Sequence, residues 1–271
     1  MMRTVERLLL ACGTEESILP PTALFNEGWL LRLALEQVSG PEFTGQLLSP
    51  RTGGRWFSEG LLPSPFLARK RGDILAEGWT HADAVVGHFE VSRGGRSEIS
   101  VARTATQFVV VEAKLGSPLS AGTTRAPFYN QAARNIACIA EVLERAGLTP
   151  EALGSVGFVV VAPACQIGPV ISREIVSKVN VRSTVEKRAG MYVGTPNELE
   201  KRTWFEKVFL PLLDAIRIEV VSWESLLDSI AGLTPKAAPA LQEFYERCLV
   251  FNRVPPPNKA LNATGAGAPA R

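Results

Sequence analysis

The chain has 271 residues, of which 46% are hydrophobic and 21% are charged, and its formal net charge at pH 7 is +2. This composition is that of a folded globular protein, which excludes a wholly disordered or fibrous chain. The net charge is too small to mark a nucleic-acid-binding protein by itself, so such a function would require basic residues clustered in one place.

The cysteine and histidine content argues against a zinc site. Four cysteines are scattered along the chain without a CxxC pair, and only His81 and His88 accompany them. Because structural zinc needs closely spaced Cys and His ligands, we expect no such site, and scattered cysteines are typical of a reduced, cytoplasmic protein.

No segment is expected to enter a membrane. Residues 8–12 (LLLAC) resemble the processing box of a lipoprotein, but Glu6 and Arg7 interrupt the apolar run that a signal peptide requires. We interpret the segment as a short buried one. Elsewhere no apolar stretch approaches the ~20 residues that span a bilayer, so we expect a soluble chain without a membrane partner.

The N-terminal part is predicted to contain a helix followed by an irregular region. Thr22 can cap a helix over residues 22–39, in which apolar residues recur at helical spacing until Gly40. Residues 41–78 are rich in Gly, Pro and Ser and predict loops with short strands.

The central part predicts strands and a helix in alternation. Residues 82–91 and 107–114 are rich in β-branched and aromatic residues and predict two strands, with a hairpin turn at a Gly-Gly pair between them. Residues 127–146 carry the apolar stripe of a helix, and residues 156–162 form the continuous apolar run of a buried strand. Strand, helix and strand in this order favour a right-handed crossover between parallel strands of an α/β sheet.

The C-terminal part is predicted to add further elements and a tail. Helical patterns cover residues 172–188, 197–213, 223–230 and 239–250, and residues 217–222 predict a strand. Residues 254–271 contain almost nothing that could be buried and predict a flexible tail. We therefore expect a single domain over residues 1–253 followed by this tail.

The chemistry of the chain is predicted to lie at the end of the strand over residues 107–114. Alternate residues of a strand share a face, so Glu112 and Lys114 point the same way. An acid and an amine at the end of an apolar strand are costly to bury unless they are paired or bind a metal. A salt-bridged strand end without further function is the alternative interpretation.

Asp83 is expected to meet Glu112. It opens the strand over residues 82–91, which should pair close to the strand that carries Glu112. Two converging carboxylates repel each other unless a cation lies between them, and hard oxygen ligands suit Mg²⁺ or Mn²⁺. The sequence therefore predicts a divalent metal between Asp83 and Glu112, with Lys114 beside it.

This arrangement resembles the PD-(D/E)xK nuclease superfamily. The signature is present as Ala82-Asp83 and Glu112-Ala113-Lys114, with Ala82 in place of the usual proline. The resemblance covers about residues 20–165 and implies a restriction-endonuclease-like α/β core, in which a central mixed sheet is flanked by helices. Residues 166–253 would then add extra C-terminal helices to that core.

The resemblance implies two further site residues. Many members carry a Glu on the helix before the sheet, and Glu27 lies on the apolar stripe of the first predicted helix, where it would be an outer or second metal ligand. Some members carry a Gln on the helix after the Glu-x-Lys strand, and Gln131 would position water or phosphate. A solvated helix residue is the alternative for Glu27, and an ordinary residue of a helix start is the alternative for Gln131.

The implied function is hydrolysis of phosphodiester bonds in nucleic acid, more often DNA than RNA in this superfamily. The chain would be a Mg²⁺- or Mn²⁺-dependent deoxyribonuclease with catalytic Asp83, Glu112, Lys114 and Gln131, and with Glu27, Asp83 and Glu112 as metal ligands. A homodimer is left open.

Two alternatives to this function remain. One is a catalytically inactive nuclease-fold module that binds nucleic acid or protein, since a fold does not dictate a function. The other is an unrelated α/β hydrolase, although the sequence has no GxSxG elbow, P-loop or GxGxxG turn.

Other polar and aromatic residues cannot be ranked by their pattern. Several basic residues could line a groove for phosphates, or they could form a solvated face. They are Arg69, Lys70, Arg71, Arg93, Arg96, Arg125 and Arg134. Trp29, Trp56 and Trp79 could stack on bases, although core packing is the more common role of Trp. We assign no role to His81 or His88.

Overall fold

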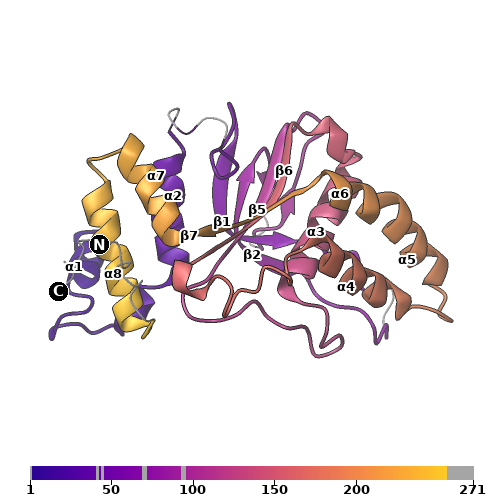
Figure 1. The fold of residues 1–271 in the computed structure, drawn as a ribbon, viewed down its shortest axis with the longest axis horizontal. Coiled ribbons are helices and arrows are strands. Elements are labelled where there is room, and N and C mark those ends of the chain that lie inside the picture. Colours follow the sequence, from indigo (N-terminus) through magenta and orange to yellow (C-terminus); the bar gives the residue numbers. More distant parts are fainter. Residues whose placement is uncertain (1, 41–42, 44–45, 69–71, 93–95, 255–271) are drawn as a thin grey trace, which may run out of the picture.

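The protein is built around a five-stranded mixed sheet with helices on both faces (Figure 1). The computed structural model describes residues 2–40, 43, 46–68, 72–92 and 96–254. The strands of this sheet are β1 (Arg55–Leu62), β2 (Thr80–Gly87), β5 (Gln107–Ala113), β6 (Ser155–Ala162) and β7 (Arg217–Ser222). A separate short ribbon pairs β3 (Glu90–Val91) with β4 (Ile99–Ser100).

Helices form a layer on each side of the sheet. One layer consists of α2 (Glu27–Val38), α7 (Trp223–Leu233) and α8 (Ala238–Phe251). The other consists of α3 (Gln131–Ala146), α4 (Lys178–Gly190), α5 (Glu198–Trp204) and α6 (Leu210–Ala215). The short helix α1 (Met2–Leu10) lies outside the first layer, beside α8 (Figure 1).

The sheet has the order β1-β2-β5-β6-β7, with antiparallel pairing from β1 to β5 and parallel pairing from β5 to β7. The predicted parallel pairing of the strands on either side of α3 is therefore confirmed. β2 ends at Gly87, whose φ is 127° and where an added Cβ would lie 2.2 Å from the carbonyl oxygen of Gln107. Only glycine fits this close approach of the two backbones.

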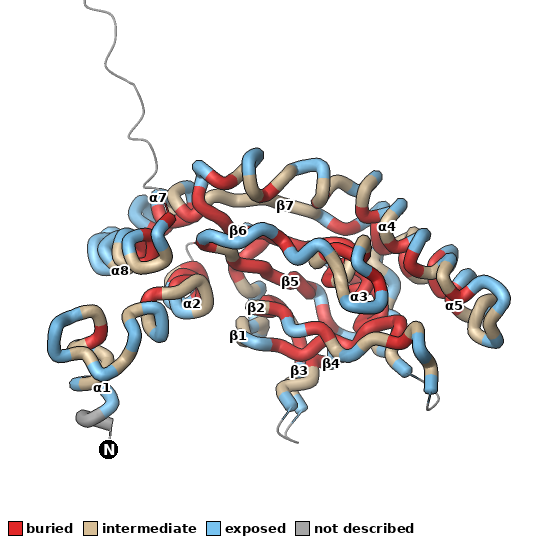
Figure 2. Tube along the Cα trace, turned by 90° about the horizontal axis from the view of Figure 1, so that it is seen from below, coloured by how far each residue is buried: buried red, intermediate tan, exposed pale blue. Residues whose placement is uncertain are grey.

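Each face of the sheet has its own hydrophobic core, and Figure 2 shows the strands buried between the two layers. Along β5, Phe108 and Val110 pack toward α3, whereas Val109 and Val111 pack toward α2 and α7. β5 is buried along its whole length, because strands covered on both faces need apolar residues at nearly every position. A charged residue on this strand must therefore find its partners inside the protein.

Several predicted elements are confirmed, with shifted ends. The helix predicted over residues 22–39 is α2, which begins only at Glu27. The reason is that the side chain of Asn26, and not of Thr22, caps it by accepting a hydrogen bond from the backbone N–H of Trp29 at 3.0 Å. Similarly, the helix predicted from residue 127 is α3, which begins at Gln131 because Asn130 caps it by accepting from Ala133.

The strand β1 lies in the region 41–78, for which loops with short strands were predicted without bounds for any strand. Within β1, Ser58 pairs with Ala84 and Gly60 pairs with Ala82, so the register places Glu59, with a φ of 57°, opposite Asp83 without a ladder pairing between them. The Ser58-Glu59-Gly60 stretch has none of the alternation or β-branched residues by which a strand is recognised in a sequence. The hairpin turn predicted at residues 94–95 lies outside the described residues.

Residues after 166 complete both layers of the fold. β7 forms the strand predicted over residues 217–222, and α7 and α8 pack against α2. The helix predicted over residues 172–188 begins only at Lys178, because Ser177 caps it, and the helix predicted over 197–213 consists of α5, a π-helical segment and α6.

The two ends of the described chain differ from expectation. The segment 8–12 was interpreted as buried, but it is the end of the amphipathic α1, with Leu10 75% exposed and only Cys12 fully buried. Val254 packs in the core beside α8 rather than belonging to a tail, and residues 255–271 lie outside the described residues. Within the described part of the chain, no helix is both long and apolar enough to cross a bilayer.

Candidate functional site

Asp83 and Glu112 lie next to each other at the same end of two neighbouring strands. The antiparallel register of β2 and β5 pairs Gly87 with Phe108 through to Ala84 with Val111, so the next position sets Asp83 opposite Glu112. Directly opposite residues on one sheet face have Cβ atoms roughly 5 Å apart. The two carboxylates therefore share the sheet face that α3 covers.

The position of Asp83 is fixed by the backbone of β5. Its Oδ2 accepts a hydrogen bond from the backbone N–H of Ala113 at 2.8 Å. The pairing of β2 with β5 stops at Ala84, so no backbone carbonyl of β2 accepts from the N–H of Ala113. The side chain of Asp83 accepts from this N–H instead, which satisfies a buried backbone donor. This contact attaches Asp83 to the residue between Glu112 and Lys114.

Glu112 is almost fully buried, with 1% of its side chain exposed, and polar side chains surround its carboxylate. Its Oε1 accepts hydrogen bonds from Lys114 Nζ at 2.6 Å and from Gln131 Nε2 at 2.5 Å. Its Oε2 accepts from Asn135 Nδ2 at 3.2 Å. A buried carboxylate held by three donors has one fixed orientation.

Burial of Glu112 and its close contact with Asp83 raise the pKa of this carboxyl group. Burial and, next, the charge of Asp83 raise the pKa of Glu112 from 4.5 to about 8, although Lys114 opposes both effects. A hydrogen bond between the two carboxyl groups also favours the protonated form of Glu112. The site therefore holds a proton near neutral pH where a cation could replace it.

Lys114 immediately follows β5 and is held there by two backbone contacts. Its N–H donates to the carbonyl oxygen of Val161 at 2.8 Å, which continues the parallel pairing with β6. Its carbonyl oxygen accepts from Trp223 Nε1 at 2.9 Å. The first turn of α7 thus helps to position the lysine, whose ammonium group is held by Glu112 Oε1 at 2.6 Å.

The start of α3 supplies the amides of the site. Gln131 is the first residue of the helix, and its Oε1 accepts from the backbone N–H of Ser120 at 3.0 Å while its Nε2 faces Glu112. Asn135 lies four residues further along and therefore on the same helix face. The sequence analysis missed Asn135, although the spacing of the two amides along a predicted helix was the signal that could have found it.

Asp83, Glu112, Lys114 and Gln131 line one cavity of about 390 Å³. Seven further residues line this cavity and were given no role or could not be ranked by sequence reasoning: Glu77, Gly78, Trp79, Thr80, His81, Thr123 and Arg134. His81 shares the face of Asp83 by strand alternation, so its position could have been inferred. Glu77 and Trp79 lie in the connection between β1 and β2, whose path no sequence pattern predicted.

Glu27 is not brought to this cavity. It begins α2 on the other face of the sheet, where its charge acts on Cys248 of α8. A carboxylate in the first turn of a helix is favoured by the helix dipole, which accounts for an acid at that position without a metal. Among the described residues, no three His, Cys, Asp or Glu side chains are grouped so that they could hold a metal ion, which leaves Asp83 and Glu112 as a pair.

The other basic and histidine candidates that the structure describes lie outside this cavity. Residues 69–71 and Arg93 lie outside the described residues, and Arg96 is exposed. Arg125 donates to the carbonyl oxygens of Asp73 and Ala76, at 3.2 and 2.6 Å. His88 contacts the backbone of Thr52 and Thr106 at the opposite end of the strands, which is a structural role.

Comparisons with known proteins identify no relative. No protein-family model matches the chain, and no curated protein and no solved structure is detectably similar to it.

Proposed function

We propose that the chain is a metal-dependent nuclease that hydrolyses phosphodiester bonds of nucleic acid. The observation that carries this proposal is the contact of Asp83 with the Glu112-Ala113-Lys114 segment inside one cavity. Packing does not explain two acids and an amine at this place, because burial penalises every one of these charges. Cation binding between the acids and anion binding at the amine do explain them.

The donor set fits Mg²⁺ or Mn²⁺. Asp83 and Glu112 offer hard carboxylate oxygens, and Asn135 occupies only one of the two lone pairs of Glu112 Oε2. Mg²⁺ is commonly bound through one or two carboxylates and keeps water and substrate phosphate as its other ligands. Two acids are therefore sufficient, and Glu27 is not needed.

Each side chain of the site has a role in the proposed reaction. A bound Mg²⁺ would lower the pKa of a water molecule and offset the charge that develops on the phosphate. Lys114 orients the attacking water and stabilises negative charge on the phosphate oxygens. Gln131 and Asn135 keep the Glu112 carboxylate in one orientation, and Gln131 is also placed to contact water or phosphate.

The order of the elements supports a restriction-endonuclease-like, PD-(D/E)xK fold for about residues 20–165. Along the five-stranded sheet, the helix α2 is followed by β1, by β2, which carries Asp83, by β5, which carries Glu112 near its end, by the helix α3 and by the parallel strand β6. The chain departs from the pattern in having Ala82 before the aspartate and in the distant position of Glu27. We propose DNA as the substrate, since it is the commoner one in the superfamily that the motif resembles.

The direct test is a cleavage assay. Purified protein is incubated with circular and linear double-stranded DNA, single-stranded DNA and RNA, with Mg²⁺ or Mn²⁺ and with EDTA. We expect cleavage of at least one DNA form that requires the metal and is lost in Asp83→Asn. Equal cleavage by Asp83→Asn would contradict the site, and binding of nucleic acid without any cleavage would favour the inactive binding module.

A further inference from the structure

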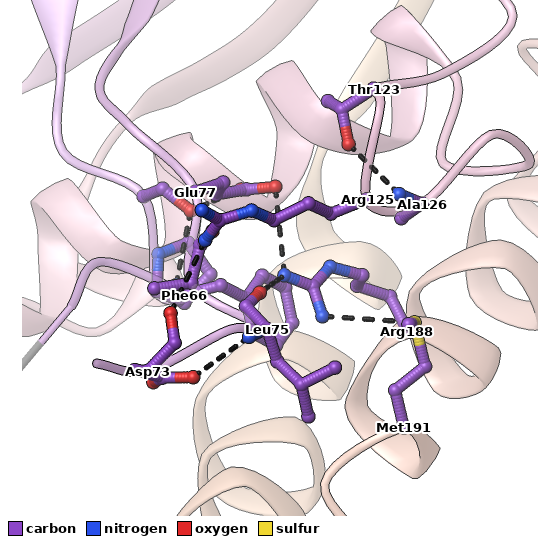
Figure 3. A network of polar contacts seen from close by, with 12 residues as sticks. Phe66, Asp73, Leu75, Glu77, Thr123, Arg125, Ala126, Arg188 and Met191 are labelled. Atoms are coloured by element: carbon purple, nitrogen blue, oxygen red, sulfur yellow. Dashed lines mark hydrogen bonds and ion pairs between the residues drawn. The ribbon is translucent and has the colours of Figure 1, made fainter.

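Two arginines, Arg125 and Arg188, contact the connection between β1 and β2 and have acceptors there (Figure 3). A third, Arg134, lines the cavity with Glu77 of that connection. Arg188 of α4 donates to the carbonyl oxygen of Leu75 at 2.5 Å, and its guanidinium lies 3.8 Å from Glu77 Oε2. Arg125 donates to the carbonyl oxygens of Asp73 and Ala76. These two arginines fix residues 73–77, of which Glu77 lines the cavity.

Arg134 is the third arginine and differs from the other two. It lies on α3, three residues after Gln131, and lines the cavity with Asp83, Glu112 and Lys114. Its buried Nε has no hydrogen-bond partner, and no acid among the described residues lies within ion-pair distance of it. Because a buried N–H without an acceptor is costly, the guanidinium is placed for an anion that enters the cavity.

Glu77 also lines the cavity, but it forms no ion pair with Arg134. Only 7% of its side chain is exposed, Ser64 donates a hydrogen bond to its Oε1, and its Oε2 accepts none. Burial raises the pKa of Glu77, whereas the charges of Arg188 and Arg134 lower it. Glu77 and Arg134 therefore attract each other without forming a close pair, and the donors of Arg134 remain available.

We propose that Arg134 is the phosphate-binding side chain of this cavity. This inference rests on the proposed nuclease function for the identity of the natural ligand, a phosphate group of nucleic acid. The planar guanidinium of arginine can donate two parallel hydrogen bonds to a phosphate, a geometry that lysine does not reproduce. Arg134 would hold the phosphate on one side while Asp83 and Glu112 hold the metal on the other.

The test measures DNA binding in EDTA, where the proposed cleavage cannot occur. A short fluorescent duplex is titrated by anisotropy at several salt concentrations with Arg134→Gln, Arg134→Lys and the control Arg217→Gln. Arg217 is 57% exposed at the start of β7, at the other end of the sheet. We expect Arg134→Gln to weaken binding about tenfold and to reduce the slope of log K against log salt by about 0.9, as loss of one phosphate contact does. Arg134→Lys should keep the slope but recover only part of the affinity.

A second measurement separates this inference from the nuclease proposal. Inorganic phosphate should raise the melting temperature of the wild type and of Arg217→Gln, but not that of Arg134→Gln. If this holds and no cleavage is found with any nucleic acid, the phosphate site stands and the nuclease proposal fails. If metal-dependent cleavage is found but Arg134→Gln retains the wild-type salt slope and phosphate response, the role of Arg134 is contradicted and the nuclease proposal stands.

Discussion

The carboxylate of Asp83 accepts a hydrogen bond at 2.8 Å from the backbone N–H of Ala113, the residue between Glu112 and Lys114. One short contact therefore joins the acid of β2 to the Glu-x-Lys segment of β5. Because Oδ2 is used by the backbone, the orientation of the Asp83 carboxylate is fixed before any ligand binds. This pre-organisation is what a metal site requires of its ligands.

Asp83→Asn is predicted to abolish cleavage without unfolding the protein. The amide oxygen of Asn can still accept the hydrogen bond from Ala113, but the negative charge needed for the metal is lost. We expect the cleavage rate to fall at least ~10³-fold, since a catalytic metal contributes several kcal/mol and each 1.36 kcal/mol is tenfold in rate. The initial rate of DNA cleavage and the melting temperature of the variant are the measurements.

Glu27→Gln is the matched control for that loss. Glu27 lies outside the cavity and on the other face of the sheet, so the substitution should leave the cleavage rate within about twofold of the wild type, as for a substitution away from the reacting groups. A loss comparable with that of Asp83→Asn would show that Glu27 reaches the metal after all.

Glu112→Gln is predicted to change how stability depends on pH. Burial and Asp83 raise the pKa of Glu112 from 4.5 to about 8, so the folded chain binds more protons than the unfolded chain between these values. The contribution of protonated Glu112 to the free energy of unfolding is fully present below about pH 4.5 and is lost as the pH rises to about 8. At 1.36 kcal/mol for each pKa unit, the lost stability has an upper limit of about 5 kcal/mol.

The measurement is urea unfolding of both proteins in EDTA across this pH range. The free energy of unfolding of the wild type should decline more steeply with pH than that of Glu112→Gln. The buried Oδ1 of Asn135, which has no hydrogen-bond partner, can accept from the new amide if Asn135 turns, so the variant is expected to fold. Parallel pH profiles for the two proteins would contradict the raised pKa of Glu112.

Metal affinity is predicted to rise with pH. At pH 7 a carboxyl group with a pKa of about 8 is mostly protonated, and a metal must displace that proton. The apparent affinity for Mn²⁺ should therefore increase up to about tenfold for each pH unit below about 8 and level off above it. Calorimetric titration in buffers with different ionisation enthalpies counts the released protons, and the absence of proton release at pH 7 would rule this linkage out.

Gln131→Ala and Asn135→Ala are predicted to weaken catalysis without abolishing it. Both amides donate to Glu112 and control the direction of its oxygens, so we expect each variant to lose roughly 10- to 100-fold in metal affinity or in cleavage rate. The control is Gln242→Ala, since Gln242 is exposed on α8 and contacts only Glu246 there. If both variants match this control, the amides serve only to pack α3 against the sheet.

The sequence by itself determined the secondary-structure pattern around the site. The apolar run of β5, the apolar stripe of α3 and the continuous apolar β6 are local features, and local propensity and periodicity are sufficient to predict them. Strand alternation alone set Glu112 and Lys114 on one face. For the same reason the sequence predicted the α/β class and the parallel pairing across α3, which are confirmed.

Only the tertiary structure decided which side chains meet. The register of β2 on β5 set Asp83 opposite Glu112, and the packing of α3 brought Asn135 to Glu112 and Arg134 to the cavity, whereas α2 carried Glu27 to the other face. The pairing of β1 with β2 placed the connection that carries Glu77 beside the cavity. These contacts join residues far apart in sequence, and their geometry follows from how whole elements pack, which no local pattern encodes.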